Sequence, residues 1–237
     1  MKDYSVSRRN VIRRAGWPAG VVLAGAIAAS GRENEAMAGK EKAEVGVTPP
    51  EDLMREHAVL ERLLLIYEKA LSAGARPANG PMTQVAAAAH LVRTFVEDYH
   101  EKLEENYLFP RFDKAGRLSD LVAVLRRQHD AGRRVTEAVL RQAGAASGQS
   151  DTRPLANDLT AFIRMYRPHA ARESTVLFPQ IAAVVSPKEY DAMGEQFEEI
   201  EHEKFGQAGF EGVVRQVAEL EKGLGIYDLA QFTPKLT

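Results

Sequence analysis

From Glu51 onward, the chain consists of long amphipathic runs separated by short clusters of Gly, Pro, Ser and Asn, and this pattern restricts its fold more than any other feature. The pattern predicts four helices, over about residues 51–73, 82–115, 119–142 and 153–185. No stretch predicts a strand with comparable clarity. We therefore expect an all-α protein, built as an antiparallel up-down four-helix bundle with a C-terminal helical extension.

The bundle is expected to occupy residues 51–185, and residues 186–237 are expected to pack on it as a C-terminal helix and tail. Ser186-Pro187-Lys188-Glu189 marks the start of this further helix. Ser supplies the N-cap, Pro suits the first helical position, and Glu three residues after the Ser closes a capping box.

Residues 1–38 have the features of a twin-arginine-type signal peptide. Ser7–Ile12 (SRRNVI) places paired arginines just before an apolar stretch, Trp17–Ser30, and Ala36-Met37-Ala38 has the small-x-small form of a cleavage site. The apolar stretch is shorter than the roughly 20 residues of a membrane span. We expect the twin-arginine machinery to export the protein to the periplasm or another extracytoplasmic compartment, with no stable membrane span in the mature form. The alternative interpretation is an unstructured basic tail.

The composition restricts the chemistry of any site. The 237 residues include no Cys, which excludes disulfides, thiolate zinc sites, iron–sulfur clusters and thiol catalysis. A metal must therefore be held by imidazole and carboxylate, and the chain has six His. The net charge of −2 gives no electrostatic reason to expect nucleic acid as a partner.

The histidines follow a repeated pattern. A His-x-x-x-Glu motif at His100 and Glu104 is followed by Leu-Phe-Pro at 108–110, and the motif at His169 and Glu173 is followed by Leu-Phe-Pro at 177–179. One further His lies on the helix before each motif, at positions 57 and 129. We interpret Leu-Phe-Pro as core packing with a helix bend, because Pro lacks the amide hydrogen.

The spacing brings these residues to one layer of the bundle. Side chains four residues apart share a helix face, and each upstream His lies about as far from its loop as the motif His does on the next helix. Four imidazoles and two carboxylates then converge, which predicts a binuclear metal site. A single buried His is more often a core residue and a single His-x-x-x-Glu pair is often only a surface pair, but the repeat argues against both interpretations.

With these residues, the chain from about Asp52 to Val184 resembles the hemerythrin-like, His-His-Glu cation-binding family. The resemblance implies a four-helix bundle with a non-haem centre of two iron ions. It further implies that the carboxylates bridge the irons and that the histidines are terminal ligands. The implied metal ligands are His57, His100, Glu104, His129, His169 and Glu173. Imidazole and carboxylate suit iron or manganese, and zinc is also compatible.

The chain departs from the oxygen-carrying hemerythrins at two of their metal ligands. Those proteins have a fifth His four residues after the third-helix His, where this chain has Arg133. Their last carboxylate is an Asp five residues after its His, where this chain has Ser174 and uses Glu173 instead. Fewer protein ligands leave more coordination positions for small molecules, which favours redox chemistry or sensing over reversible oxygen carriage.

Two functions remain open from the sequence. The first is an exported metal-binding protein that binds or senses oxygen, nitric oxide or iron. The second is a di-iron oxidoreductase that acts on peroxide, as a catalase or peroxidase does. In both, the expected partner is a small diatomic ligand or peroxide.

Four further side chains have weaker claims on the site. His90 is expected to be a surface or packing residue. His202 reaches the metal layer if the fifth helix folds back on the fourth; otherwise it belongs to a solvated acidic face. Tyr99 and Tyr166 flank the motifs, where core packing or a hydrogen bond to a species at the metal is possible.

Overall fold

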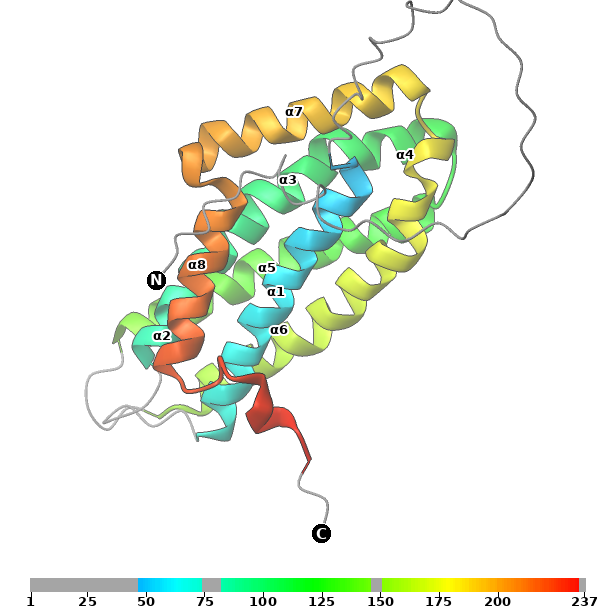
Figure 1. Ribbon diagram of the computed structural model, residues 1–237. Coiled ribbons are helices and arrows are strands. Elements are labelled where there is room, and N and C mark those ends of the chain that lie inside the picture. Colours follow the sequence, from blue (N-terminus) through cyan, green and yellow to red (C-terminus); the bar gives the residue numbers. More distant parts are fainter. Residues whose placement is uncertain (1–46, 74–81, 146–150, 235–237) are drawn as a thin grey trace, which may run out of the picture. The chain divides into compact units, whose positions relative to one another are not determined.

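The computed structural model describes residues 47–73, 82–145 and 151–234, and every regular element in these ranges is helical (Figure 1). This agrees with the predicted all-α class. The predicted signal peptide, residues 1–38, lies outside the described residues. No helix in the described ranges is both long and apolar enough to cross a membrane.

The four predicted long helices are present. The first is α1, Pro49–Ser72, and the third is α5, Ser119–Ala145. The second contains π-helical segments between its α-helical parts, and the fourth ends in a π-helical and a 3-10 segment. The second consists of α2 (Met82–Leu91), η3 (Val92–His100), α3 (Glu101–Leu103), η4 (Glu104–Leu108) and α4 (Phe109–Ala115). The fourth consists of α6 (Arg153–Arg172), η5 (Glu173–Leu177) and η6 (Phe178–Ala183).

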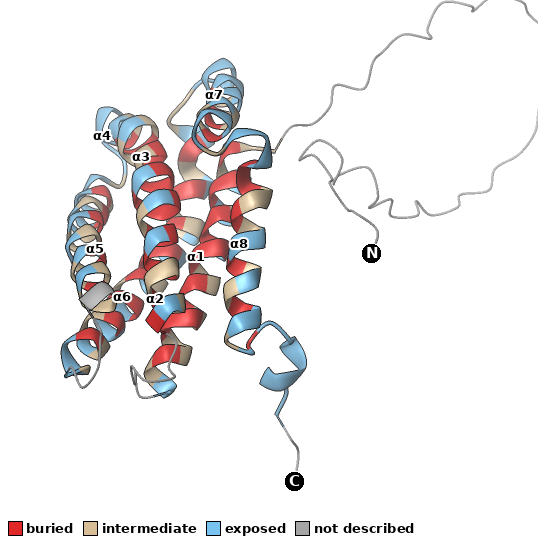
Figure 2. Cartoon of the chain, turned by 90° about the vertical axis from the view of Figure 1, so that its left-hand side faces the viewer, coloured by how far each residue is buried: buried red, intermediate tan, exposed pale blue. Residues whose placement is uncertain are grey.

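These helices pack in a closed ring around one core. α5 contacts α6 and α2, and α1 contacts α6 and α2. Buried residues line the inward faces of all four (Figure 2). The core is aliphatic and aromatic, but six of its buried side chains are the histidines and glutamates of the predicted site. A helical bundle therefore encloses a polar layer.

The C-terminal region forms two helices, where the sequence predicted one. The predicted capping box is present at the start of α7 (Pro187–Phe205), since Ser186 Oγ accepts the Glu189 amide hydrogen at 3.3 Å and Glu189 Oε2 accepts the Ser186 amide hydrogen at 3.0 Å. The chain then breaks at Gly206, whose φ of 62° lies outside the right-handed helical region. After the short turn η7 (Gly206–Ala208), α8 begins.

The two C-terminal helices pack on different parts of the bundle. α8 (Gly209–Gly223) packs along α1 and α2, whereas α7 contacts α1, η6 and α8 (Figure 1). A final turn, η8 (Leu229–Phe232), follows, and Leu229 is 80% exposed. α7 thus lies beside the N-terminal part of α1 (Figure 1).

Candidate metal centre

Both motif carboxylates stand at the first position of a π-helical turn. Glu104 begins η4 and Glu173 begins η5, and each turn is five residues long. Phe-Pro directly follows each π turn and forms the first two residues of the next segment. Because Pro cannot donate the amide hydrogen of a regular turn, the wider π turn lies where the α-helical bonding is already interrupted. Leu-Phe-Pro therefore belongs to the local geometry that sets the two glutamates.

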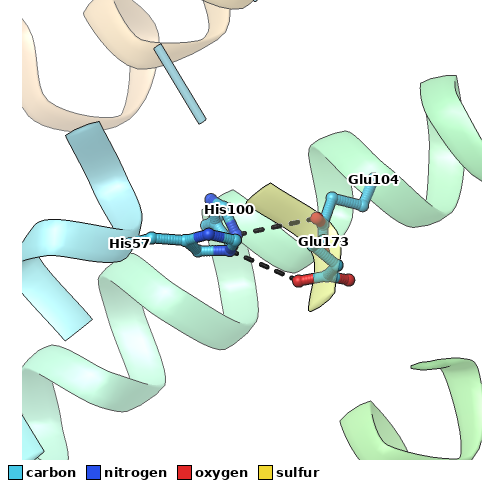
Figure 3. A group of neighbouring side chains, drawn as sticks. All are labelled: His57, His100, Glu104 and Glu173. Carbon is cyan, nitrogen blue, oxygen red and sulfur yellow. Dashed lines mark ion pairs between the residues drawn. The ribbon is translucent and has the colours of Figure 1, made fainter. Parts of the chain in front are cut away.

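The structure brings all six predicted residues together in two groups that share both glutamates. His57 and His100 form one group with the glutamates, and His129 and His169 form the other. Within each group, the potential ligand atoms lie within 4.8 Å of one another. All six residues are between 0% and 6% exposed. Figure 3 shows His57 and His100 facing the carboxylates of the first group.

The Nε2 atoms of the imidazoles all face the shared carboxylates. The distances are 3.3 Å from His57 and 3.0 Å from His169 to Glu173 Oε2, 3.4 Å from His129 to Glu104 Oε2, and 3.8 Å from His100 to Glu104 Oε1. The Nε2 atoms of His129 and His169 lie 3.3 Å apart. Nitrogen and oxygen atoms from all four long helices therefore converge in one layer.

The other ring nitrogen of each imidazole is held by a second side chain. Nδ1 contacts Ser174 Oγ at 2.8 Å in His57, Glu56 Oε2 at 2.7 Å in His100, Glu105 Oε1 at 3.1 Å in His129, and Gln128 Oε1 at 2.9 Å in His169. All four partners offer an acceptor oxygen to an Nδ1 hydrogen. The neutral tautomer that donates from Nδ1 leaves the Nε2 lone pair directed at the carboxylates, as metal ligation requires.

These four partners extend the sequence repeat by one residue on each side. Glu56 and Gln128 each directly precede the upstream His, and Glu105 and Ser174 each directly follow the motif Glu. The sequence interpretation missed all four as functional residues. Their equivalent positions in the two halves were the signal that could have identified them.

The phenylalanines of Leu-Phe-Pro hold two of the imidazoles from the opposite half. Phe109 stacks on His129 with ring centroids 5.5 Å apart, and Phe178 stacks on His57 at 5.2 Å. Each motif thus orients the upstream His of the other half. The expectation of core packing is confirmed, and the packing also fixes the rings of the site.

Burial and mutual repulsion perturb the charges of the site. Burial lowers the pKa of both His100 and His129 to about 4, so these imidazoles are neutral at pH 7. Burial, together with the negative charge of Glu173, raises the pKa of Glu104 well above its usual value.

The side chains fit a pair of cations. In the described part of the chain, neither oxygen of Glu104 or Glu173 meets a donor in hydrogen-bonding geometry. Buried carboxylates without hydrogen bonds are costly, and facing nitrogen lone pairs repel. A cation in each group would satisfy both kinds of atom, and the donor set of neutral imidazole and carboxylate suits iron, manganese or zinc.

Metal uptake by the metal-free protein is expected to release a proton from Glu104. The metal-bound form needs the carboxylate, whereas the raised pKa favours the protonated form when no metal is bound. Because the bound state carries fewer protons, the apparent affinity rises with pH toward that pKa. Calorimetric titration with zinc in two buffers of different ionisation enthalpy counts the protons. An affinity that is independent of pH between about 5.5 and 8 contradicts the expectation.

Other candidates do not join the two groups. His90 is exposed, as expected. His202 is also exposed, and its neighbour Glu201 is the buried residue of that turn, which agrees with the alternative that His202 belongs to a solvated face. Tyr166 donates its hydroxyl hydrogen to Glu101 Oε1 at 2.6 Å, and Tyr99 packs against Phe205, with ring centroids 5.2 Å apart.

Comparison with known proteins agrees with this geometry. The model of the hemerythrin HHE cation binding domain matches residues 48–181. Proteins of Mycobacterium tuberculosis and Mycobacterium bovis, both named only as uncharacterized, are 46% identical over 236 residues, which covers 97% of this chain and 92% of theirs. No solved structure matches the chain. The matched domain contains all six residues that converge in the bundle.

Proposed function

Since the chain belongs to the hemerythrin HHE cation-binding family, we propose that it is a non-haem di-iron protein that binds or senses oxygen, nitric oxide or iron. One observation carries the proposal: two groups of buried ligand atoms share Glu104 and Glu173. A shared pair of carboxylates is what a binuclear centre requires, whereas separate single-metal sites would need no common residue.

Each side chain has a definite task in this proposal. Glu104 and Glu173 would be ligands shared by both ions, and two imidazoles would hold each ion, from His57 and His100 or from the other pair. The imidazoles are held by their Nδ1 partners, so the site is formed before metal binds. When bound, iron would supply a Lewis acid that exchanges electrons. Phe109 and Phe178 help to exclude water around the ligands.

The ring of contacts among α1, α2, α5 and α6 supports the finer proposal of an antiparallel up-down four-helix bundle. In that arrangement, the short connections place neighbouring helices antiparallel and bring the histidines of each pair to one level. The paired arginines and apolar stretch within residues 1–38 support export by the twin-arginine route to an extracytoplasmic compartment.

A second candidate function is peroxide chemistry at the same centre. It is favoured by Arg133, which stands where the oxygen-carrying relatives have a fifth histidine and instead pairs with Glu101 and Glu105. With six protein ligands, the ions keep positions at which peroxide could bind and be reduced.

Anaerobic iron loading of the purified protein, followed by metal analysis and absorption spectroscopy, tests the proposal. We expect about two iron ions per chain and a spectrum that changes with dioxygen or nitric oxide. A change with dioxygen that reverses on degassing supports binding, whereas sustained peroxide consumption supports the second function. Fewer than about one ion per chain contradicts both.

A further inference from the structure

The sequence repeat gives the bundle two equivalent outer faces, and helix α8 covers the first of them. α8 packs along α1 and α2, and two arginines of α1 contact its carboxylates. Arg62 donates to both carboxylate oxygens of Glu221, at 2.9 Å and 2.5 Å. Arg55 donates to Glu211 at 3.4 Å, and its guanidinium lies 4.6 Å from the centre of the Phe210 ring. On this face, the bundle therefore binds an acidic helix through arginine side chains.

The same two arginines recur on α5, in the second half of the repeat. Arg127 lies two residues before the upstream histidine of that half, and Arg134 lies five residues after it. Arg55 and Arg62 have the same spacing in the first half. α5 and α8 lie on opposite sides of the bundle (Figure 2). Arg127 and Arg134 are exposed, and neither has an ion-pair partner among the described residues. The second face thus keeps the arginines that bind α8 on the first.

Two other side chains of the second face are smaller or more polar than their equivalents on the first. Phe95, five residues before the motif histidine of its half, contacts Phe210 of α8, with ring centroids 6.3 Å apart. Arg164 stands at the equivalent position on α6 and is exposed. Val92 is fully buried, whereas the equivalent Ala161 is exposed. A helix that binds the second face therefore meets less apolar surface and is held mainly by charge.

Helix α7 presents the charge that complements these arginines. It carries a row of exposed carboxylates at intervals of four residues, formed by Asp191, Glu195, Glu199 and Glu203. Neighbouring members of the row share a helix face. Within residues 47–73, 82–145 and 151–234, none of the four has a cationic partner. α7 packs on α1, η6 and α8 of its own chain, so this row is available for contact with another copy.

We propose that Arg127, Arg134 and Arg164 form a basic face that binds α7 of a second copy of the protein. The arginines pair with the α7 carboxylates across the contact, as Arg55 and Arg62 pair with α8 within one chain. Exposed ion pairs are individually weak and are screened by salt, so the association is reversible and depends on ionic strength. None of these side chains belongs to a metal group, so the inference does not depend on the proposed function.

Sedimentation velocity of the full chain, at several protein concentrations and two salt concentrations, tests the inference. We expect copies to associate at about 20 mM salt and to separate at about 0.5 M, where the Debye length is only a few ångströms. Arg127→Glu combined with Arg134→Glu turns two attractions into repulsions and is expected to weaken the association by about tenfold. Glu195→Lys combined with Glu199→Lys reverses the other side of the contact and is expected to have the same effect.

A chain with all four substitutions separates a specific contact from an effect of net charge. The two reversals of each sign cancel, so this chain keeps the net charge of −2 of the unmodified protein. The signs on the two surfaces are exchanged but still complementary, so association is expected to return. Arg215→Glu is the matched control for Arg134→Glu, because Arg215 is an exposed arginine of α8 and its reversal changes the net charge equally. It should leave the association constant within about twofold.

The inference is overturned if the unmodified chain stays monomeric at about 20 mM salt and about 0.5 mM protein. It is also overturned if both double variants associate as the unmodified chain does, since the copies then meet through another surface. Failure of the chain with all four substitutions to associate contradicts it, as does an equal weakening by Arg215→Glu and Arg134→Glu. Should the α5 variants fail to fold, the α7 variant tests the same contact, and undiminished association of that variant overturns the inference.

Discussion

Glu104→Gln is expected to stabilise the metal-free protein by about 1–3 kcal/mol while abolishing most of the stabilisation that metal provides. Gln has nearly the same shape as Glu but is neutral without taking up a proton, so it removes the cost of keeping a carboxyl protonated and buried beside Glu173. A ligand that binds only the folded state stabilises it by about 4 kcal/mol at a thousandfold excess over its Kd. The substitution removes a carboxylate that both groups of potential ligand atoms share, so this gain is expected to be largely lost.

The stabilisation of the metal-free protein by Glu104→Gln is expected to depend on pH, and the raised pKa of Glu104 fixes the direction of this dependence. The folded-state pKa of Glu104 lies above its unfolded value, so the carboxyl imposes no cost well below about pH 4.5. Its cost grows as pH rises from the unfolded pKa toward the folded one. The stabilisation of the metal-free protein by Glu104→Gln is therefore expected to be larger at pH 7 than at pH 4.5.

Thermal unfolding with and without metal measures the stabilisation of the metal-free protein and the loss of stabilisation by metal. For a protein of this size, a change of 1 kcal/mol in the free energy of unfolding shifts the melting temperature by roughly 2–4 °C. Glu97→Gln is a suitable control, because Glu97 is fully buried and its pKa is raised by burial, yet it belongs to neither metal group. It should leave metal binding unchanged. The bridging role of Glu104 is contradicted if Glu104→Gln retains two metal ions per chain.

The sequence could predict the helices and the six converging residues because both depend on local periodicity. Helical spacing fixes which side chains share a face, and Gly and Pro clusters fix where helices end, as at Gly116. The distance of each His from its loop then fixes its level in the bundle. None of these inferences requires knowledge of how the helices rotate about their axes.

The residues that sequence reasoning missed depend on that rotation. The sequence left two positions open for His202, and the packing of α7 on α1, η6 and α8 buries Glu201 and leaves His202 exposed. One residue corresponds to about 100° around a helix, so an error of one position exchanges buried and exposed faces. The Nδ1 partners of the histidines, such as Gln128, were missed for the same reason, since they lie beside a ligand on the helix.

Gly132→Ala is expected to destabilise the protein by about 2–4 kcal/mol, although Ala favours a helix interior by about 1 kcal/mol over Gly. Gly132 lies within α5, directly against the ring of Tyr166 on α6. A Cβ there would overlap the Tyr166 hydroxyl and lie 2.6 Å and 2.7 Å from two of its ring carbons. The ring must move, and its hydrogen bond to Glu101 is then lost.

The loss of the hydrogen bond between Tyr166 and Glu101 makes Gly132→Ala more destabilising than overpacking alone would. Glu101 is 1% exposed, and leaving a buried acceptor without its partner costs about 1–3 kcal/mol. Burial already raises the pKa of Glu101 to about 8, and the Tyr166 hydroxyl is a donor that opposes this rise. The Tyr166 ring also lies 5.4 Å from that of His169, so displacement is expected to weaken metal binding as well.

Chemical denaturation of a double-mutant cycle with Tyr166→Phe measures the coupling. Phe lacks the hydroxyl, so its cost should be smaller in the Gly132→Ala background, where the hydrogen bond is already lost, than in the unmodified protein. The ring carbons still crowd the new methyl group, so the double variant is not expected to recover full stability. Gly223→Ala is the control, since its Cβ would meet only Gln84, at 3.4 Å, and should be nearly neutral. If the costs in the cycle are additive, the contributions of Gly132 and Tyr166 to stability do not depend on each other. The close approach of α5 to α6 at Gly132 then does not determine the position of the Tyr166 side chain beside the metal centre.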